Sequence, residues 1–299
     1  MTSAGRLTVR ARRHGNELVQ AVVELQRPAV ARLFIGQPPE AVVKTVPYLY
    51  TLCAHAQRSA AQAALAAAAD ELRRPVDDTE LWIEFLHENL WRLLLDWPPA
   101  LGLAPAGEAF VAWRASRHGG ECLAETRKLL AGPLRELAGR CLEQFAEPKP
   151  AISGGLAPLT PKAWLDYWRG RSSAAPTVCR PASPAAAYRA RLVDVDLAVA
   201  ALADNRPYPV AAAGGGGWGI GQTLTARGVL THAAQIDRGL VRRYRVWAPT
   251  DCHFADADGV ERLLAGRRFA DPDAARRGLE QAVLALDPCL PYVLELEDA

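Results

Sequence analysis

The sequence predicts an α+β fold that is mostly helical. Two stretches, residues 6–25 and 229–247, carry alternating apolar residues and turn signals that are typical of β-hairpins. Much of the chain between them is rich in residues that favour helices. With 299 residues, 50% of them hydrophobic, the chain can bury a sizeable core. We predict one domain over residues 1–299, with a hairpin and a cysteine-bearing helix (1–75), a helical middle (76–170), a flexible loop (171–190), and a long C-terminal β-hairpin with a terminal cysteine segment (191–299).

The N-terminal part should pack its hairpin on two helices. His14-Gly15-Asn16 supplies the hairpin turn. Pro39 suits the first position of a helix, and Pro47 marks a new turn after it. From residue 48 to 72 the composition predicts a longer helix, with Cys53 in its first turns. Small residues on this helix would let another element pack closely against it: Ala56, Ala60, Ala63, Ala64 and Ala67.

The middle of the chain is predicted to form a bundle of helices. Asp77-Asp78-Thr79-Glu80 is an acidic helix start, and apolar residues then keep a helical spacing. His87 and Glu88 are adjacent, and the residue four positions after His87 is Trp91, so no metal-binding pair forms and we expect a structural role. Further helices are expected at 108–116, at 121–145 and around 164–168, with a Pro/Gly linker at 148–161 and a mobile loop at 172–185.

The C-terminal hairpin should turn at Asp237-Arg238-Gly239-Leu240, where glycine allows a positive φ. If the loop has two residues, facing positions have a constant sum, and Arg227 falls opposite Thr250. A bulge would move this register by one residue. The far end of the hairpin would then gather a guanidinium, Pro249 and a hydroxyl. The alternative is a surface hairpin with a basic face.

The glycine-rich run from Gly214 to Gly221 has GxGxxG-like spacings. No βαβ unit surrounds it, no Lys-Ser/Thr pair follows it, and the next predicted element is a strand. We therefore expect no nucleotide site. The glycines should instead let the backbone approach the base of the hairpin closely.

Composition excludes several classes of protein. The formal net charge is +2 and the basic residues are dispersed, which gives no case for nucleic-acid binding. The six cysteines are too sparse for a disulfide framework, and no two form a CxxC. The N-terminus lacks the apolar stretch of a signal peptide, and charge follows the Ala-rich run 60–69. We expect a soluble, cytoplasmic protein that has no membrane association.

Several short motifs resemble those of [NiFe]-hydrogenase large subunits and occur in the same order: Arg227-Gly228, Gly239, Ala248-Pro249-Thr250 and Asp287-Pro288-Cys289. Near the N-terminus, fourteen residues after Gly36 comes Tyr50, and three further on comes Cys53, which matches the spacing of the family's first cysteine pair. The likeness covers roughly residues 5–72 and 214–292, and the middle, which contains HENLWRLLLDWP, is much shorter. The chain resembles the HupK/HoxV family of hydrogenase accessory proteins, which implies the fold of a shortened large subunit.

Departures from the hydrogenase pattern decide what the resemblance implies. The enzymes hold nickel with four thiolates, two of which bridge to an iron that carries two cyanides and one carbon monoxide. Here Cys53 and Cys289 keep one cysteine of each pair, whereas Tyr50 and Tyr292 replace the others. Soft thiolates suit both metals, but two cannot build a nickel tetrathiolate. The resemblance therefore implies Cys53 and Cys289 as iron ligands, and no nickel.

Two further departures imply that hydrogen turnover is lost, so that the chain is not an enzyme. Ala4 stands where the enzymes have a proton-relay glutamate, and Glu295 stands where they have their terminal histidine. That histidine is also where a protease removes a C-terminal extension. We therefore expect no such processing here.

The resemblance also implies a pocket for the diatomic ligands, lined by Arg227, Pro249 and Thr250. Cyanide nitrogens accept hydrogen bonds, so a guanidinium and a hydroxyl suit them in a dry cavity. Arg227 as a surface cation and Thr250 as a strand end are the alternatives. Cys252, which replaces a tryptophan of the enzyme motif, is a candidate third thiol.

The implied function is that of a maturation scaffold that transiently binds the Fe(CN)2CO group and hands it to a hydrogenase large subunit. The implied partners are a HypC-like chaperone and HypD, which build that group, and the large subunit itself. The alternative is a metal-free interaction protein that docks to the maturation machinery.

Overall fold

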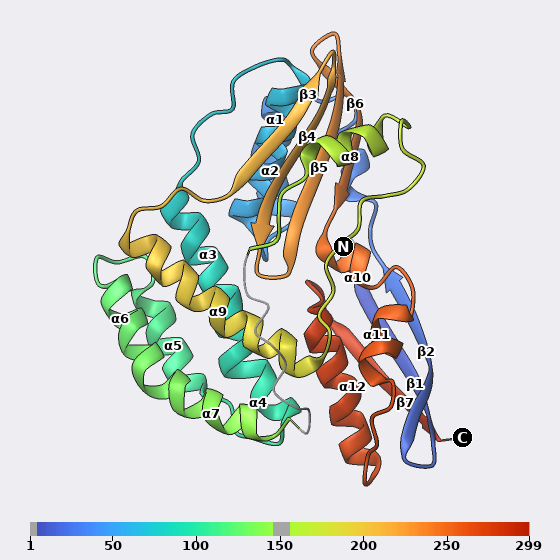
Figure 1. Ribbon diagram of the computed structural model, residues 1–299. Helices are drawn as coiled ribbons and strands as arrows, with labels where there is room; N and C mark the ends of the chain where they lie inside the picture. Colours follow the sequence, from blue (N-terminus) through green and yellow to red (C-terminus); the bar gives the residue numbers. More distant parts are fainter. Residues whose placement is uncertain (1–4, 146–155, 299) are drawn as a thin grey trace.

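The chain folds into two β-sheets and a helical region, which confirms the predicted α+β class (Figure 1). The computed structural model describes residues 5–145 and 156–298. In Figure 1 the larger sheet lies at the top, most of the helices lie at the lower left, and the smaller sheet lies at the lower right with the last helices. The candidate site lies where these three parts meet.

A smaller sheet joins the two ends of the chain. It consists of β1 (Arg6–His14), β2 (Glu17–Gln26) and β7 (Tyr292–Asp298), and α11 (Asp258–Leu264) and α12 (Pro272–Leu286) pack against it. The strand order is β2-β1-β7, so the predicted N-terminal hairpin is confirmed. The strands β1 and β7 are parallel, with Leu7 opposite Tyr292. This pairing fixes the segment just before β7, which carries Cys289.

A larger antiparallel sheet is covered by helices on both faces. Helix α2 packs on one face with α1 beside it, and α8 covers the other face (Figure 1). These elements are β3 (Val210–Gly215), β4 (Trp218–Thr225), β5 (Gly228–Asp237), β6 (Leu240–Trp247), α1 (Pro39–Leu49), α2 (Ala54–Ala68) and α8 (Pro161–Trp168), and the short helix α10 (Pro249–His253) follows β6. The strand order is β3-β4-β5-β6.

Glycines bring β4 into direct backbone contact with α2. A Cβ at Gly219 would lie 2.0 Å from the carbonyl oxygen of Ala64, and one at Gly221 would lie 2.1 Å from that of Ala60. The predicted close approach is confirmed for both the glycine run and the small-residue face of the helix. The predicted partner of the glycines is only partly right, because Gly219 and Gly221 meet α2, whereas Gly217 meets the carbonyl oxygen of Ile236 in the hairpin, near its turn rather than its base. Only elements that both lack bulky side chains can pack this closely.

The long hairpin is confirmed, but its predicted register is wrong. Arg238 and Gly239 form a two-residue loop with positive φ at both positions, and Asp237 faces Leu240 as expected. A bulge next to Gln235 then moves the pairing by one residue, and the strands end before Arg227 and Thr250 can face each other. These two residues are brought to the same end of the sheet by the β4–β5 turn and by α10.

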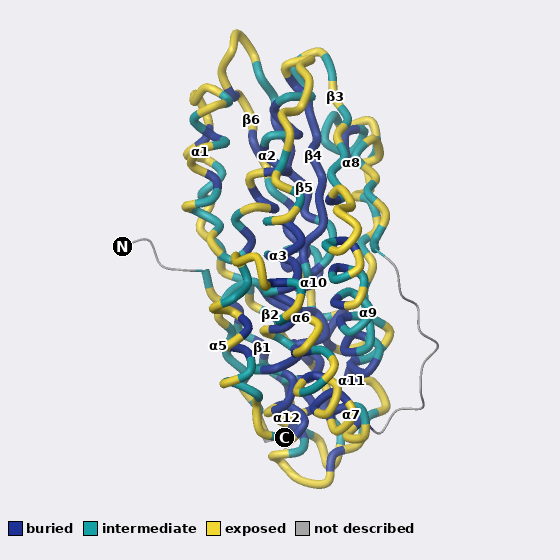
Figure 2. The backbone as a smooth tube through the Cα atoms, turned by 90° about the vertical axis from the view of Figure 1, so that its left-hand side faces the viewer, coloured by how far each residue is buried: buried dark blue, intermediate teal, exposed yellow. Residues whose placement is uncertain are grey.

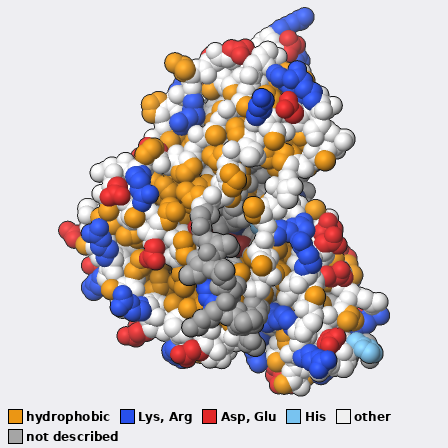
Figure 3. Space-filling model, viewed as in Figure 1, with side chains coloured by type: hydrophobic (Ala, Val, Ile, Leu, Met, Phe, Trp, Pro, Cys, Tyr) orange, Lys and Arg blue, Asp and Glu red, His pale blue; other side chains and the backbone are white. Residues whose placement is uncertain are grey.

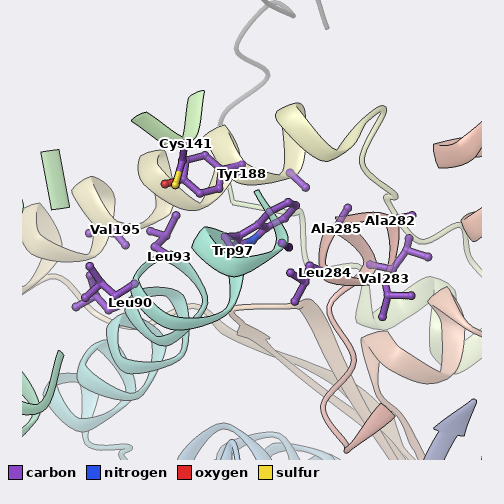
Figure 4. Packing of buried hydrophobic residues seen from close by; sticks show 14 of the residues in the cluster. Leu90, Leu93, Trp97, Cys141, Tyr188, Val195, Ala282, Val283, Leu284 and Ala285 are labelled. Atoms are coloured by element: carbon purple, nitrogen blue, oxygen red, sulfur yellow. The ribbon is translucent and has the colours of Figure 1, made fainter. Parts of the chain in front are cut away.

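The helical part is built around a core of aromatic and leucine side chains. Its elements are α3 (Asp78–Trp91), α4 (Trp97–Ala100), α5 (Gly107–Ser116), α6 (Cys122–Leu129), α7 (Arg135–Glu143) and α9 (Pro184–Ala203), with π-helical turns at Arg92–Asp96 and Leu130–Leu134. Asp77 caps α3 by accepting the Glu80 N–H at 3.0 Å. Trp97 and Tyr188 are fully buried with ring centroids 5.5 Å apart, and Cys141 lies beside them (Figure 4).

Three local predictions are wrong. Pro47 lies inside α1, where it removes a single N–H near the helix end instead of starting a new turn. Cys53 is the N-cap of α2 rather than part of its first turns, because the chain breaks from helix between α1 and α2. The predicted flexible loop 171–190 ends at Ser183, whose hydroxyl caps α9 by accepting the Ala186 N–H at 3.2 Å. Ala4 and linker residues 148–155 lie outside the described residues.

Buried residues concentrate along α2, β4 and β5 and around α3 and α12 (Figure 2). On the face shown in Figure 3, basic and acidic side chains are interspersed rather than gathered in one stripe. In the part of the chain that the structure describes, no helix is both long enough and apolar enough to span a membrane.

Candidate metal-group site

Two cysteines from opposite ends of the chain line the same cavity. Cys53 and Cys289 line a cavity of about 390 Å³ together with Arg27 and Tyr50. Cys289 also lines a second cavity of about 470 Å³, which Arg227 borders. The two cavities share Cys289 and the two residues that follow it, Leu290 and Pro291.

Cys53 lies buried at the N-terminal end of α2. The N–H groups of His55 and Ala56, in the first turn of the helix, donate to the carboxylate of Glu84 on α3 at 2.8 and 2.9 Å. Burial raises the pKa of the Cys53 thiol to about 12, and the Glu84 carboxylate adds to the increase. Without a metal, Cys53 is therefore a neutral thiol, and a metal that binds it must displace its proton.

A series of buried hydrogen bonds connects the sulfur of Cys53 to Tyr244. Gln57, one turn later on α2, donates from Nε2 to the Cys53 sulfur at 3.7 Å, and its Oε1 lies 2.8 Å from Nε2 of His232. Nδ1 of His232 lies 2.7 Å from the hydroxyl of Tyr244. Burial lowers the pKa of His232 to about 3, so the ring is neutral. The tautomer with the proton on Nε2 then satisfies all of these contacts.

Cys289 lies three residues after the last residue of α12, Leu286. Asp287 caps that helix in the left-handed conformation, with φ 51°, and turns the chain away. The N–H of Cys289 then donates to Oγ1 of Thr250 at 3.0 Å. Nη2 of Arg27 lies 2.6 Å from the Cys289 sulfur. Cys289 is therefore held through its backbone by α10 and contacted at its sulfur by a guanidinium.

Arg227 is at the centre of a buried ionic cluster. Its side chain is 3% exposed, and Nη2 donates to Oε2 of Glu88 at 2.6 Å. Asp287 binds Arg92, with Nε 2.7 Å from Oδ1, and also binds Arg191. Although burial acts to raise the pKa of Asp287, the guanidiniums of Arg191, Arg92 and Arg227 lower it well below its usual range. The cluster therefore stays ionised at neutral pH and holds Arg227 in place.

Arg227 also keeps donors that no acceptor uses. Among the described residues, its buried Nε and Nη1 have no hydrogen-bond partner, and the 3.6 Å between Nε and Oδ1 of Asp287 is too long for one. A buried N–H without an acceptor carries a free-energy cost. Arg227 is also a lining residue of the second cavity, and a ligand whose acceptor atoms reached these donors would satisfy them.

Two tyrosines line the cavities beside the cysteines. Tyr50 lines the first cavity and Tyr292 the second. Burial raises the pKa of Tyr50 to about 12 and raises that of Tyr292 as well, so both are neutral phenols. Over residues 5–145 and 156–298, no group of three or more His, Cys, Asp or Glu is arranged to hold a metal ion. A metal at Cys53 and Cys289 must therefore bring most of its own ligands.

The other residues predicted for the site are placed as follows. Thr250 is fully buried and reaches the site through the N–H of Cys289. Pro249 packs next to Gly228 and lines neither cavity. Cys252 belongs to an aromatic cluster with Trp247 and also lines neither cavity, so it is not placed to act as a third thiol.

Sequence reasoning missed several residues of the site. Glu88 was assigned only a structural role, although it lies in the HENLWRLLLDWP stretch, and it pairs with Arg227. Asp287 was quoted in a motif but given no role. Arg27 had no signal at all, because its contact with Cys289 joins residues 262 positions apart.

Known proteins of similar sequence place the chain in a family. No model of a known protein family matches it. The hydrogenase expression/formation protein HupV of Azotobacter chroococcum mcd 1 is 30% identical over 341 residues, covering 98% of this chain and 99% of the relative. The chain belongs to the HupK/HupV/HoxV family. HupK of Azotobacter vinelandii is 29% identical and HoxV of Cupriavidus necator is 25% identical, and they cover 99% and 92% of this family member.

Solved structures with a fold similar to that of this HupK/HupV/HoxV family member include hydrogenases. A [NiFeSe] hydrogenase variant from Desulfovibrio vulgaris Hildenborough has a TM-score of 0.66 at 13% identity, covering 96% of this chain and 99% of that chain. An NAD+-reducing [NiFe]-hydrogenase has a TM-score of 0.54 at 14% identity, covering 91% and 92%. The predicted relation to the large-subunit fold is confirmed. At these identities the likeness establishes the fold alone.

Proposed function

We propose that this protein acts in hydrogenase maturation as a scaffold that transiently binds the Fe(CN)2CO group and passes it to a hydrogenase large subunit. One observation carries the proposal: Cys53, Cys289 and Arg227, which has unused donors, line two cavities that share Cys289. Two thiolates are a poor ligand set for a bare ion. They are sufficient for an iron that already carries three ligands.

Recognition of the group follows from its charge and its acceptors. The cyanide nitrogens accept hydrogen bonds, and Nε and Nη1 of Arg227 are buried donors without acceptors among the described residues. Two thiolates and two cyanides around ferrous iron give an anionic complex, and guanidiniums at Arg27 and Arg227 favour such a charge. Thr250 supports this arrangement by positioning the backbone of Cys289.

Release requires that this protein bind the iron group less tightly than a hydrogenase does. Half the thiolates of the hydrogenase site are replaced by neutral tyrosines, Tyr50 and Tyr292, which are poor ligands for soft metals. We propose a HypC-like chaperone with HypD as the donors of the iron group, the large subunit as its acceptor, and the cytoplasm as the place of transfer. In this role the protein carries its cargo without catalysing a reaction.

Infrared spectroscopy tests the proposal, because CO and CN stretches fall where protein does not absorb. Protein purified without oxygen from cells with an active maturation system should show CO and CN bands and about one iron per chain. Cys53→Ala or Cys289→Ala should remove both, while Cys122→Ala and Cys141→Ala, in helices α6 and α7, should not. If the bands are absent from the wild-type protein, or if iron persists in the Cys53/Cys289 double variant, a metal-free interaction protein is the better explanation.

A further inference from the structure

Arg27 contacts both the sulfur of Cys289 and the carboxylate of Asp251. It follows directly after β2, and its side chain reaches the sulfur of Cys289 with Nη2 at 2.6 Å. Its Nε lies 3.0 Å from Oδ1 of Asp251. Asp251 is itself anchored, because its Oδ2 accepts the Ala248 N–H at 3.0 Å at the start of α10. Arg27 therefore bridges a fixed carboxylate and a proposed iron ligand.

The two arginines near Cys289 differ in their freedom to move. Arg227 is 3% exposed and is held by Glu88 and Asp287. The side chain of Arg27 is 25% exposed, and its ion-pair partner Asp251 is 28% exposed. Arg227 borders the second cavity, and Arg27 lines the first. Arg27 is thus the more exposed of the two arginines, and its ion-pair partner is also the more exposed.

A guanidinium on the Cys289 sulfur conflicts with the passage of a metal group. The cavity that Arg27 lines is the one that both cysteines line, so an iron group that binds both thiols lies beside Arg27. A thiolate can accept a hydrogen bond and bind a metal at the same time, so Arg27 can cover Cys289 in both states. Asp251 stays within reach of Arg27 as a pivot when the contact with sulfur opens.

We propose that Arg27 is a gate over Cys289, which swings on Asp251 each time the iron group enters or leaves. The inference rests on the proposed function, since it assigns to the same site a device that controls exchange. The rates of association and dissociation distinguish a gate from a contact that only retains the bound group. A holding contact slows departure only, whereas a gate slows arrival and departure alike.

Cadmium alone is a suitable probe, because its thiolate complexes absorb in the ultraviolet and it binds soft ligands. Stopped-flow absorbance of the full chain without oxygen gives the association rate, and transfer of bound cadmium to excess chelator gives the dissociation rate. Arg27→Gln should raise both rates by about tenfold, the effect of losing one charge-assisted hydrogen bond, with the dissociation constant changed by less than about threefold. Asp251→Asn keeps an acceptor for Ala248 but loses the charge, and should also raise both rates.

Arg32→Gln is the matched control, because Arg32 is an exposed arginine of the same segment, and it should change neither rate. Unchanged rates in Arg27→Gln, or an increase confined to dissociation, would overturn the gate. The urea midpoint of each variant shows whether a rate change reflects local opening or a weakened fold. If wild-type protein takes up no cadmium at Cys53 and Cys289, the two-cysteine site has failed, and the gate fails with it. If uptake depends on both cysteines but not on Arg27, only the gate is wrong.

Discussion

Replacing Arg227 by leucine tests the ionic cluster on which the site depends. The change leaves Glu88, 4% exposed, without its guanidinium partner, whereas Asp287 keeps Arg92 and Arg191. Removing one partner of a buried ion pair costs about 3–5 kcal/mol. We expect a loss near the lower end, about 3 kcal/mol, because Nδ1 of His87 still lies 3.3 Å from Oε1 of Glu88.

Urea unfolding at pH 7 measures this loss, and a second substitution identifies its cause. Glu88→Gln removes the uncompensated charge, so the Arg227→Leu/Glu88→Gln protein should be more stable than Arg227→Leu alone, with a coupling of about 1–3 kcal/mol. Although burial acts to raise it, the pKa of Glu88 is lowered in the folded protein by His87 and Arg227. The stabilisation from this shift is present above the unfolded pKa and disappears as the pH falls. The difference between wild type and Arg227→Leu should therefore shrink below about pH 4.3.

Two results would refute this reasoning. An Arg227→Leu protein within about 0.5 kcal/mol of wild type at pH 7 would mean that Glu88 does not rely on Arg227. A double variant no more stable than Arg227→Leu would mean that the uncompensated carboxylate is not the cause of the loss.

Three further outcomes are expected. Gly219→Ala should lower the free energy of unfolding by several kcal/mol, because its Cβ would meet the Ala64 carbonyl oxygen. The control Gly139→Ala, in α7 and with open space around it, should be neutral or stabilising. Equal urea midpoints for the two variants would contradict the backbone contact. Because the pKa of His232 falls from 6.5 to about 3 on folding, stability should drop as the pH is lowered from 6.5 toward 3, and His232→Gln should show a smaller drop across that window in urea midpoints. Deleting residues 292–299 removes β7, so the amides of β1 should exchange hydrogen faster by mass spectrometry, and unchanged exchange would show that β7 does not secure that edge.

Much of the fold could be predicted from local patterns. Alternation around His14-Gly15-Asn16 and around Arg238-Gly239 predicted both hairpins, because a strand with one buried face shows a period of two and a tight turn needs particular residues. Acidic and hydroxyl residues before apolar runs predicted the start of α3. The motifs around Cys53 and Cys289 predicted the family, and the structure places both cysteines at one cavity.

The sequence by itself thus determined the elements, the family and the two thiols, whereas the tertiary structure decided how the site is built around them. No periodic pattern in the sequence predicts that Arg27 contacts Cys289, 262 residues away, or that Glu88 contacts Arg227, 139 residues away. A pattern shows that a residue is buried, but its partner depends on how whole elements pack. One bulge beside Gln235 moved the register enough to end the predicted pairing of Arg227 and Thr250, and packing then brought both to Cys289 from a turn and a short helix. Local preferences act over a few residues, while the contacts of a buried ionic cluster form only when distant segments meet.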